Sequence, residues 1–200
     1  GSVSAIRQGD IRRMIAFSSV AQIGYIFMGM GLGTADGMMA AVFHIFSHSC
    51  CKAMLFLAAG GLADASGNSK QFPDLRGAGF REKVAGVCFC VSAMSLVGVP
   101  VLGGFISKLF LSDAAITHGG ITMWVMLIAL AVSTLLNVLY LMKTIITLYR
   151  PAREGFCAPE VKPSRLADFA MCGFIVLNVL VGLLAEPLMQ AIRLGLVMFD

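Results

Sequence analysis

Long stretches without a charged residue constrain this 200-residue chain more than any other feature. Residues 37–62 are mostly apolar, and they contain three basic residues, His44, His48 and Lys52. Uncharged runs of 22, 24, 29 and 17 residues occupy residues 14–35, 84–107, 114–142 and 169–185. Because a helix needs about 20 apolar residues to cross a bilayer core, the sequence predicts an all-α integral membrane protein.

Composition agrees with this class and excludes others. Hydrophobic residues make up 58% of the chain and charged residues 13%, about half the charge content of soluble proteins. A disordered chain, a nucleic-acid binder and a disulfide-stapled secreted domain are therefore excluded. The first residues do not form a signal peptide, and we interpret the chain as the later part of a longer polypeptide. Six cysteines without C-x-x-C spacing are interpreted as reduced small hydrophobes: Cys50, Cys51, Cys88, Cys90, Cys157 and Cys172.

Residues 98–104, with the sequence GVPVLGG, interrupt one apolar stretch. Proline lacks a backbone donor and glycine weakens a helical turn, so a helix cannot run smoothly here. Either two full spans meet at this point, or one span over 82–117 is broken in the middle. The flanking helices of about 13 to 18 residues would each reach only about 20–27 Å, which is short for a crossing.

The basic residues decide between these topologies. They gather in three segments, separated by turns that have none: Arg7, Arg12 and Arg13; Lys70, Arg76, Arg81 and Lys83; Arg150, Arg153, Lys162 and Arg165. If 82–117 crosses once, basic and neutral loops alternate, as the positive-inside rule expects. We therefore expect about five transmembrane helices, the third discontinuous, and cytoplasmic basic loops: spans 10–33, 37–62, 82–117, 121–149 and 165–192.

Four basic residues other than histidine lie outside these segments. Lys143 and Arg193 are near predicted span ends, where their side chains can reach the interface. Lys52 and Lys108 are deeper, and ionisable residues inside a membrane usually serve function. Lys108 follows the break, where free backbone groups can form hydrogen bonds with its charged side chain. The alternative is that Lys108 snorkels or forms a bundle salt bridge. Asp113, five residues later, is either its partner or an interfacial charge.

His44, His48 and Lys52 form a second group. Their spacing of four residues places them along one helix face, each about 6 Å along the axis from the last. Three titratable groups in such a stripe can pass protons along with water between them. Structural hydrogen bonding between helices and metal binding are the alternatives, and metal is disfavoured because no carboxylate lies nearby in sequence.

Polar residues also mark two other predicted spans, and they either join helices or line a water path. They are Ser18, Ser19, Gln22 and Tyr25 in the first span and Ser133, Asn137 and Tyr140 in the fourth. The sequence carries no nucleophile elbow, P-loop or dinucleotide fingerprint. We therefore predict no catalytic residue, no metal site and no cofactor in this chain.

Three ordered motifs resemble the proton-translocating antiporter-like subunits of respiratory complex I and Mrp-type cation/proton antiporters. The first is DIRRMIAFSSVAQIG at residues 10–24, in which Phe17 replaces the usual tyrosine. The second is H-x-x-x-H-x-x-x-K-A-x-L-F-L, which begins at His44. The third is G-x-P-x-x-x-G-F-x-S-K, which ends at Lys108.

The resemblance implies the C-terminal half of a subunit of about fourteen helices, built from two inverted five-helix repeats with one broken helix each. Residues 1–150 would hold the second repeat with its first helix truncated, and residues 151–200 a cytoplasmic loop and the final helix. By resemblance, Lys108 matches the lysine near the exit half-channel and Lys52 the central-axis lysine, with His44 and His48 leading to it. The Glu–Lys pair of the first repeat lies outside these residues, so the fragment is not expected to pump alone.

We therefore expect membrane proton translocation, within a cation/proton antiporter or a redox-driven pump such as an NADH-quinone oxidoreductase or hydrogenase. The expected partners are membrane lipid, other membrane subunits and protons, with Na⁺ as a second candidate ion and no nucleic acid. The expected location is a bacterial inner membrane. A secondary transporter of a small solute and a non-conducting structural subunit are the alternatives.

Overall fold

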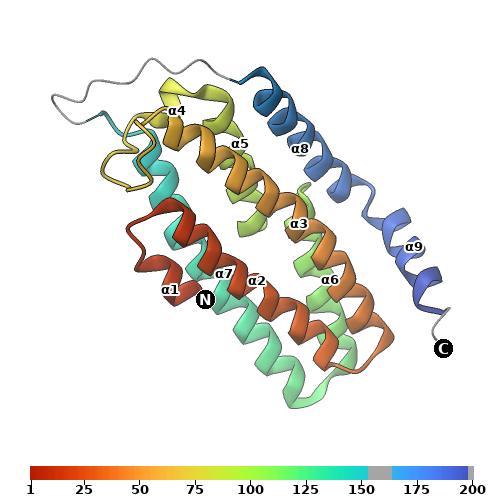
Figure 1. Cartoon of the computed structure of the whole chain (residues 1–200). Coiled ribbons are helices and arrows are strands. Elements are labelled where there is room, and N and C mark those ends of the chain that lie inside the picture. Colours follow the sequence, from red (N-terminus) through yellow and green to blue (C-terminus); the bar gives the residue numbers. More distant parts are fainter. Residues whose placement is uncertain (153–163, 198–200) are drawn as a thin grey trace.

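The computed structural model describes residues 1–152 and 164–197, and within them the regular elements are helices (Figure 1). Outside the helices, one isolated β-bridge joins Asp10 and Gln71. The helices are α1 (Ser2–Ile6), α2 (Ile11–Gly31), α3 (Ala35–Asp64), α4 (Ala78–Arg81), α5 (Lys83–Val97), α6 (Gly103–His118), α7 (Gly120–Leu148), α8 (Arg165–Leu183) and α9 (Ala185–Val197). The prediction of an all-α protein is confirmed for the described residues.

Among the described residues, four helices are long and apolar enough to cross a membrane: α2, α3, α7 and α8. The start of α2 shows how the sequence sets such a boundary. Asp10 is the N-cap, and its carboxylate accepts hydrogen bonds from the backbone N–H groups of Arg12 and Arg13. A carboxylate here satisfies free N–H groups at the positive end of the helix dipole. The apolar run then begins with the buried Ile11 and Met14.

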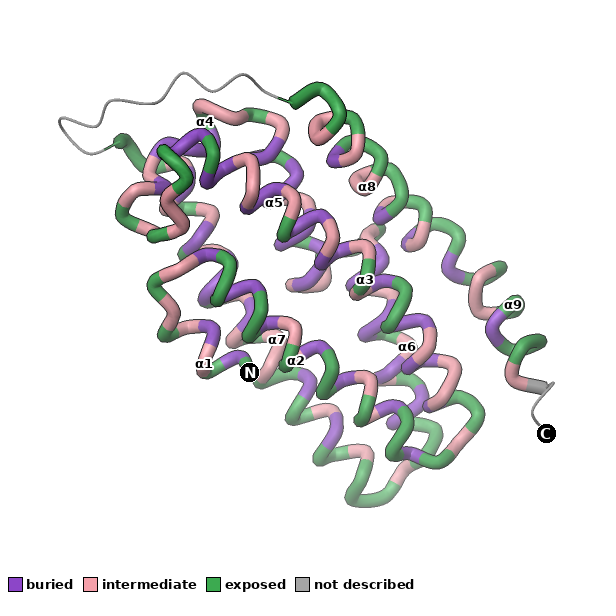
Figure 2. The backbone as a smooth tube through the Cα atoms, in the orientation of Figure 1, coloured by how far each residue is buried: buried purple, intermediate pink, exposed green. Residues whose placement is uncertain are grey.

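The longest helix, α3, lies at the centre of the bundle. It contacts α2, α5, α6, α8 and α9. Half of the residues in the apolar stretch of α3 are buried inside the protein, against 17% in that of α8. Helix α8 therefore lies at the outside of the bundle. In Figure 2 the buried residues follow α3 and the helix faces turned toward it, whereas the outer faces of α7, α8 and α9 are largely exposed. The polar side chains on the buried face of α3, namely His44, Ser47 and Lys52, are therefore withdrawn from both water and lipid.

The predicted break in the third element is confirmed: α5 ends at Val97 and α6 begins at Gly103. Gly98 has a φ of 101°, a left-handed conformation that ends α5. Pro100 follows, and Gly104 lies directly against the Ser95 backbone, where a Cβ atom would collide with the carbonyl group. A chain that bends back on itself this closely requires glycine at this position.

The two halves continue one path along α3. On α5, the Cys88 thiol lies 3.8 Å from the Met54 carbonyl in the second half of α3. On α6, the Ser107 hydroxyl lies 3.0 Å from His44 in the first half of α3. Helix α5 thus contacts the second half of α3, and the following helix α6 contacts the first half. The two helices therefore run antiparallel to α3, one after the other, as one divided crossing (Figure 1).

The last predicted span is wrong in one respect. A single helix was expected over 165–192, but α8 ends at Leu183 and α9 begins at Ala185. The physical reason is Pro187, which has no N–H to donate to the carbonyl of Leu183 four residues earlier. Proline is tolerated in the first turn of a helix, and this is where α9 places it.

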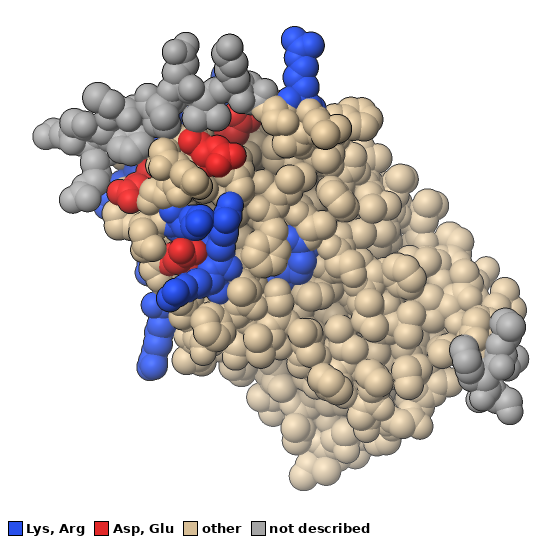
Figure 3. Space-filling model, viewed as in Figure 1, with Lys and Arg blue, Asp and Glu red and all other residues tan. Residues whose placement is uncertain are grey.

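The first two basic segments, and the start of the third, lie at one end of the bundle. The backbone N–H of Ile11 donates a hydrogen bond to the backbone carbonyl of Lys70 at 2.9 Å, which joins the first segment to the second. Gly77 in the second segment lies against the backbone of Arg150. Figure 3 shows basic and acidic side chains gathered at this end of the bundle, with a largely uncharged surface over the rest of this view. Arg153, Lys162 and Cys157 lie outside the described residues.

Candidate functional site

Two lysines are buried inside the helix bundle. Lys52 on α3 is 7% exposed and Lys108 on α6 is 8% exposed. An ionised amine in such a place needs oxygen atoms around it, because an unsolvated charge is very costly. The partners of each amine therefore define the chemistry of the site.

Lys52 is held by helix α2. Its ammonium donates hydrogen bonds to the Ile15 carbonyl, at 3.1 Å, and to the Ser18 hydroxyl. The Ser18 hydroxyl in turn donates to the same Ile15 carbonyl, at 2.7 Å. All these partners are neutral oxygens, and no carboxylate of the described residues pairs with this lysine. The amine is therefore held by uncharged oxygen atoms of α2.

Lys108 is held by the end of α5. Its ammonium donates to the carbonyls of Leu96, at 2.6 Å, and Val97, at 2.9 Å. Carbonyls in the last turn of a helix have no partner within the helix and carry the negative end of its dipole. The break therefore supplies the oxygens that hold this charge inside the bundle.

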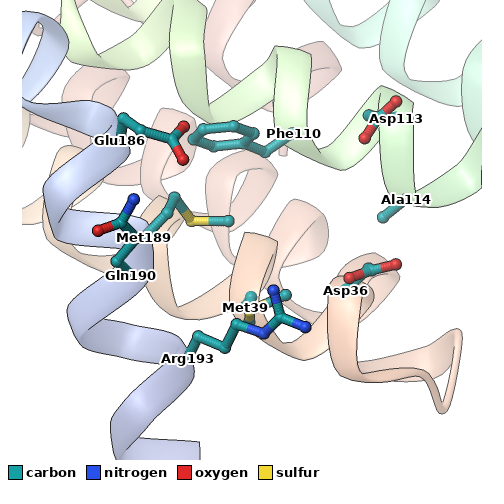
Figure 4. A pocket seen from close by; sticks show the side chains of 9 residues that line it. All are labelled: Asp36, Met39, Phe110, Asp113, Ala114, Glu186, Met189, Gln190 and Arg193. Carbon is teal, nitrogen blue, oxygen red and sulfur yellow. The ribbon is translucent and has the colours of Figure 1, made fainter.

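Asp113 is not the partner of Lys108 among the described residues. It is exposed and lines a cavity of about 190 Å³ at the end of the bundle opposite the basic loops. Asp36, Glu186 and Arg193 line the same cavity, from α3 and α9 (Figure 4). Of the two alternatives for Asp113, the structure supports an interfacial charge.

The two histidines connect the lysines. The rings of His44 and His48 are stacked, with centroids 6.1 Å apart and planes at 9°. Lys52 follows His48 by one turn of α3, and the His44 ring reaches Ser107, the residue before Lys108, at 3.0 Å. The structure thus brings the four predicted site residues into one group. Within the described residues, no cluster of three or more His, Cys, Asp or Glu side chains could hold a metal ion.

The predicted polar faces divide into buried and half-buried members. Ser19 and Ser133 are only half-buried, and the hydroxyl of Ser19 bonds its own helix. The buried members lie on α2 and α7, which contact each other, namely Ser18, Gln22, Tyr25, Asn137 and Tyr140. Tyr140 donates to Asn137 Oδ1 at 2.8 Å, which joins two predicted residues of α7.

Several buried polar atoms in this region have no hydrogen-bond partner in the protein. They include Gln22 Nε2, Tyr25 Oη, Asn137 Nδ2 and the Nε2 atoms of both His44 and His48. Buried polar atoms are almost always hydrogen-bonded, and ordered water is the usual partner when protein supplies none. Ordered water is therefore the expected partner of these atoms.

Sequence reasoning missed a second polar cluster, between α3, α5 and α8. Asn178 Nδ2 donates to Cys51 Sγ at 3.0 Å, and the Cys51 thiol donates to Ser95 Oγ at 3.2 Å. Ser95 Oγ also accepts the backbone N–H of Gly104 at 3.1 Å. The signal available in the sequence was an asparagine in the last apolar run, since amides inside membranes need partners. Cys51 is buried as expected, but it also bonds two side chains.

The bundle, its broken helix and its two buried lysines define a membrane subunit of the antiporter-like class. The family described as NADH:quinone oxidoreductase/Mrp antiporter, TM, matches residues 1–136. This chain belongs to that family, and the resemblance seen in the three motifs is confirmed.

Relatives of the chain are NADH-quinone oxidoreductase subunits. Subunit N of Desulforudis audaxviator is 36% identical over 165 residues, which are 82% of this chain and 32% of the relative. Subunit N 2 of Sorangium cellulosum is 28% identical over 187 residues, 94% of this chain and 37% of the relative. The chain thus spans less than half the length of the curated relatives it matches.

Solved structures share the fold. A chain of the archaeal membrane-bound sulfane sulfur reductase is similar with a TM-score of 0.81 and 28% identity, over 97% of this chain and 38% of that one. A chain of the Mrp complex from Dietzia sp. has a TM-score of 0.75 and 26% identity, over 96% of this chain and 43% of that one. A chain of complex I from Thermus thermophilus has a TM-score of 0.72 and 23% identity, over 96% of this chain and 42% of that one, which shows the fold alone.

Proposed function

We propose that this chain carries protons across a membrane through Lys52, His48, His44 and Lys108, as part of a larger membrane complex. The observation that carries the proposal is the pair of buried lysines, whose hydrogen bonds in the described residues go to neutral oxygens, together with the two stacked histidines near them. A buried amine without a carboxylate partner costs little to neutralise, so it can take up and release a proton as its surroundings change.

The connection between the lysines supports this assignment. His44 and His48 each have a buried Nε2 without a protein partner, and Gln22 and Tyr25 add further free polar atoms beside them. Imidazole is the side chain best suited to exchanging protons near neutral pH. Ordered water at these atoms would complete hydrogen-bonded steps that are too long for direct transfer.

The test is a set of matched lysine variants in the full-length protein within its complex. Lys52→Met and Lys108→Met keep side-chain length but remove the proton-carrying group. Lys143→Met is the control, because Lys143 is an exposed lysine on α7 outside the buried group. We expect proton translocation in proteoliposomes to fall more than about tenfold in the first two variants and to persist in the control. Normal translocation in correctly assembled Lys52→Met and Lys108→Met complexes would favour a structural subunit.

The complex that contains the chain is the second part of the proposal. We propose a redox-driven proton pump or a cation/proton antiporter in a bacterial inner membrane, with the basic loops in the cytoplasm. Mass spectrometry of co-purifying subunits separates the two, since iron–sulfur and flavin or nickel subunits indicate a redox pump and only small membrane subunits indicate an antiporter. Exchange of Na⁺ for protons in proteoliposomes tests the second ion. Uptake of a small solute without partner subunits would favour a secondary transporter.

A further inference from the structure

The hydroxyl of Ser107 makes two hydrogen bonds that together determine the state of His44. Ser107 is fully buried on the first turns of α6, one residue before Lys108. Its Oγ donates to the Gly104 carbonyl at 3.0 Å. The same Oγ lies 3.0 Å from His44 Nδ1 on α3.

The number of protons available decides which atom donates in the second contact. A serine hydroxyl carries one hydrogen, and a carbonyl oxygen can only accept. When the Ser107 hydrogen is directed at the Gly104 carbonyl, Ser107 Oγ accepts a hydrogen from His44 Nδ1. Neutral His44 is then the Nδ1–H tautomer, and its lone pair is on Nε2.

The surroundings of Nε2 fit an atom that exchanges protons. It is buried and makes no hydrogen bond in the protein. The ring of Tyr25 meets the His44 ring edge-on, with centroids 5.5 Å apart, and the His48 ring is stacked with the His44 ring. The backbone of Gln22 also interacts with the His44 ring, and His48 and Lys108 are the titratable groups that act on it.

We propose that Ser107 is a positioning residue that holds His44 in the Nδ1–H tautomer, so that Nε2 is the atom through which His44 takes up and releases a proton. Uptake at Nε2 gives an imidazolium with both nitrogens protonated, and release from Nε2 restores the neutral ring. Release from Nδ1 is blocked, because Ser107 would have to pass its own hydrogen to a carbonyl that cannot be protonated. The tautomer rests on the hydrogen bonds alone, and its use in transport rests on the proposed function.

The experiment reads the tautomer directly. The full-length protein in its complex is labelled with ¹⁵N-histidine, and solid-state NMR distinguishes protonated from unprotonated ring nitrogens. A His44→Gln variant assigns the His44 signals. We expect a protonated Nδ1 and an unprotonated Nε2 in the wild type, loss of this preference in Ser107→Ala, and its return in Ser107→Thr, which keeps the hydroxyl. A protonated Nε2 in the wild type, with its hydrogen toward Gln22, would overturn the proposal, as would an unchanged tautomer in Ser107→Ala.

Ser112→Ala is the matched control. Ser112 is on the same helix and donates to the Lys108 carbonyl at 2.9 Å, but its hydroxyl bonds no histidine. We expect its His44 spectrum to match the wild type, and a change equal to that of Ser107→Ala would overturn the proposal. The NMR result does not depend on transport. Failure of the proposed function would appear instead as normal translocation in Lys52→Met and Lys108→Met.

Discussion

The close packing at Gly104 makes a strong test of how the broken helix works. In Gly104→Ala, the new Cβ would lie 2.7 Å from the Ser95 carbonyl carbon and 3.0 Å from its hydroxyl oxygen, and closer still to the carbonyl oxygen. These are backbone and short side-chain atoms, which cannot move aside without moving the end of α5. We therefore expect α5 and α6 to separate by on the order of 1 Å, a misplacement that can cost on the order of 100-fold in positioned chemistry.

The same displacement affects stability and the lysine. Overpacking of this kind costs about 1–3 kcal/mol, which exceeds the helix-propensity gain of about 1 kcal/mol from replacing glycine with alanine. Lys108 contacts the Leu96 and Val97 carbonyls across this junction, so both hydrogen bonds lengthen. We expect a lower thermal unfolding midpoint for the purified complex and a proton translocation rate reduced by roughly 10- to 100-fold.

Gly24→Ala provides the matched control. Gly24 is inside α2, and an added Cβ there meets nothing within 4 Å. This variant should unfold at the same or a higher temperature and translocate protons normally. If Gly104→Ala behaves like Gly24→Ala in both assays, then the contact between the halves of the broken helix does not position Lys108.

Three further variants test individual contacts. Ser18→Ala removes one of the two acceptors of the Lys52 ammonium, at a cost of about 1–3 kcal/mol. We expect slower proton translocation in Ser18→Ala and normal translocation in Ser18→Thr. Equal rates in the wild type and both variants would refute a role for this contact. Asn178→Leu removes the hydrogen bond to Cys51, and we expect a thermal midpoint lowered by an amount equivalent to about 1 kcal/mol, with Leu177→Ala, on the exposed side of α8, as the comparison. Asp113→Asn should leave translocation within about a factor of two, because Lys108 binds carbonyls; a loss as large as in Lys108→Met would show that Asp113 is its partner.

Local features of the chain were predictable because they depend on neighbours in sequence. The N-cap at Asp10 and the break after Gly98 follow from residue types whose backbone preferences are strong. The division at Leu184 was equally local, and Pro187 was its signal. It was missed because apolar residues predominate on both sides, with Glu186 as the one charged residue in 169–192.

The sequence by itself determined a membrane bundle with one broken crossing, its basic end and the two lysines to examine. Hydrophobic length, proline, glycine and charge act within a few residues, so they are readable along the chain. Only the tertiary structure decided that Lys108 binds the carbonyls of α5 rather than Asp113, and that Ser107 reaches His44. Such contacts depend on how each helix is rotated and how closely its neighbours approach, and residues far apart in sequence set both.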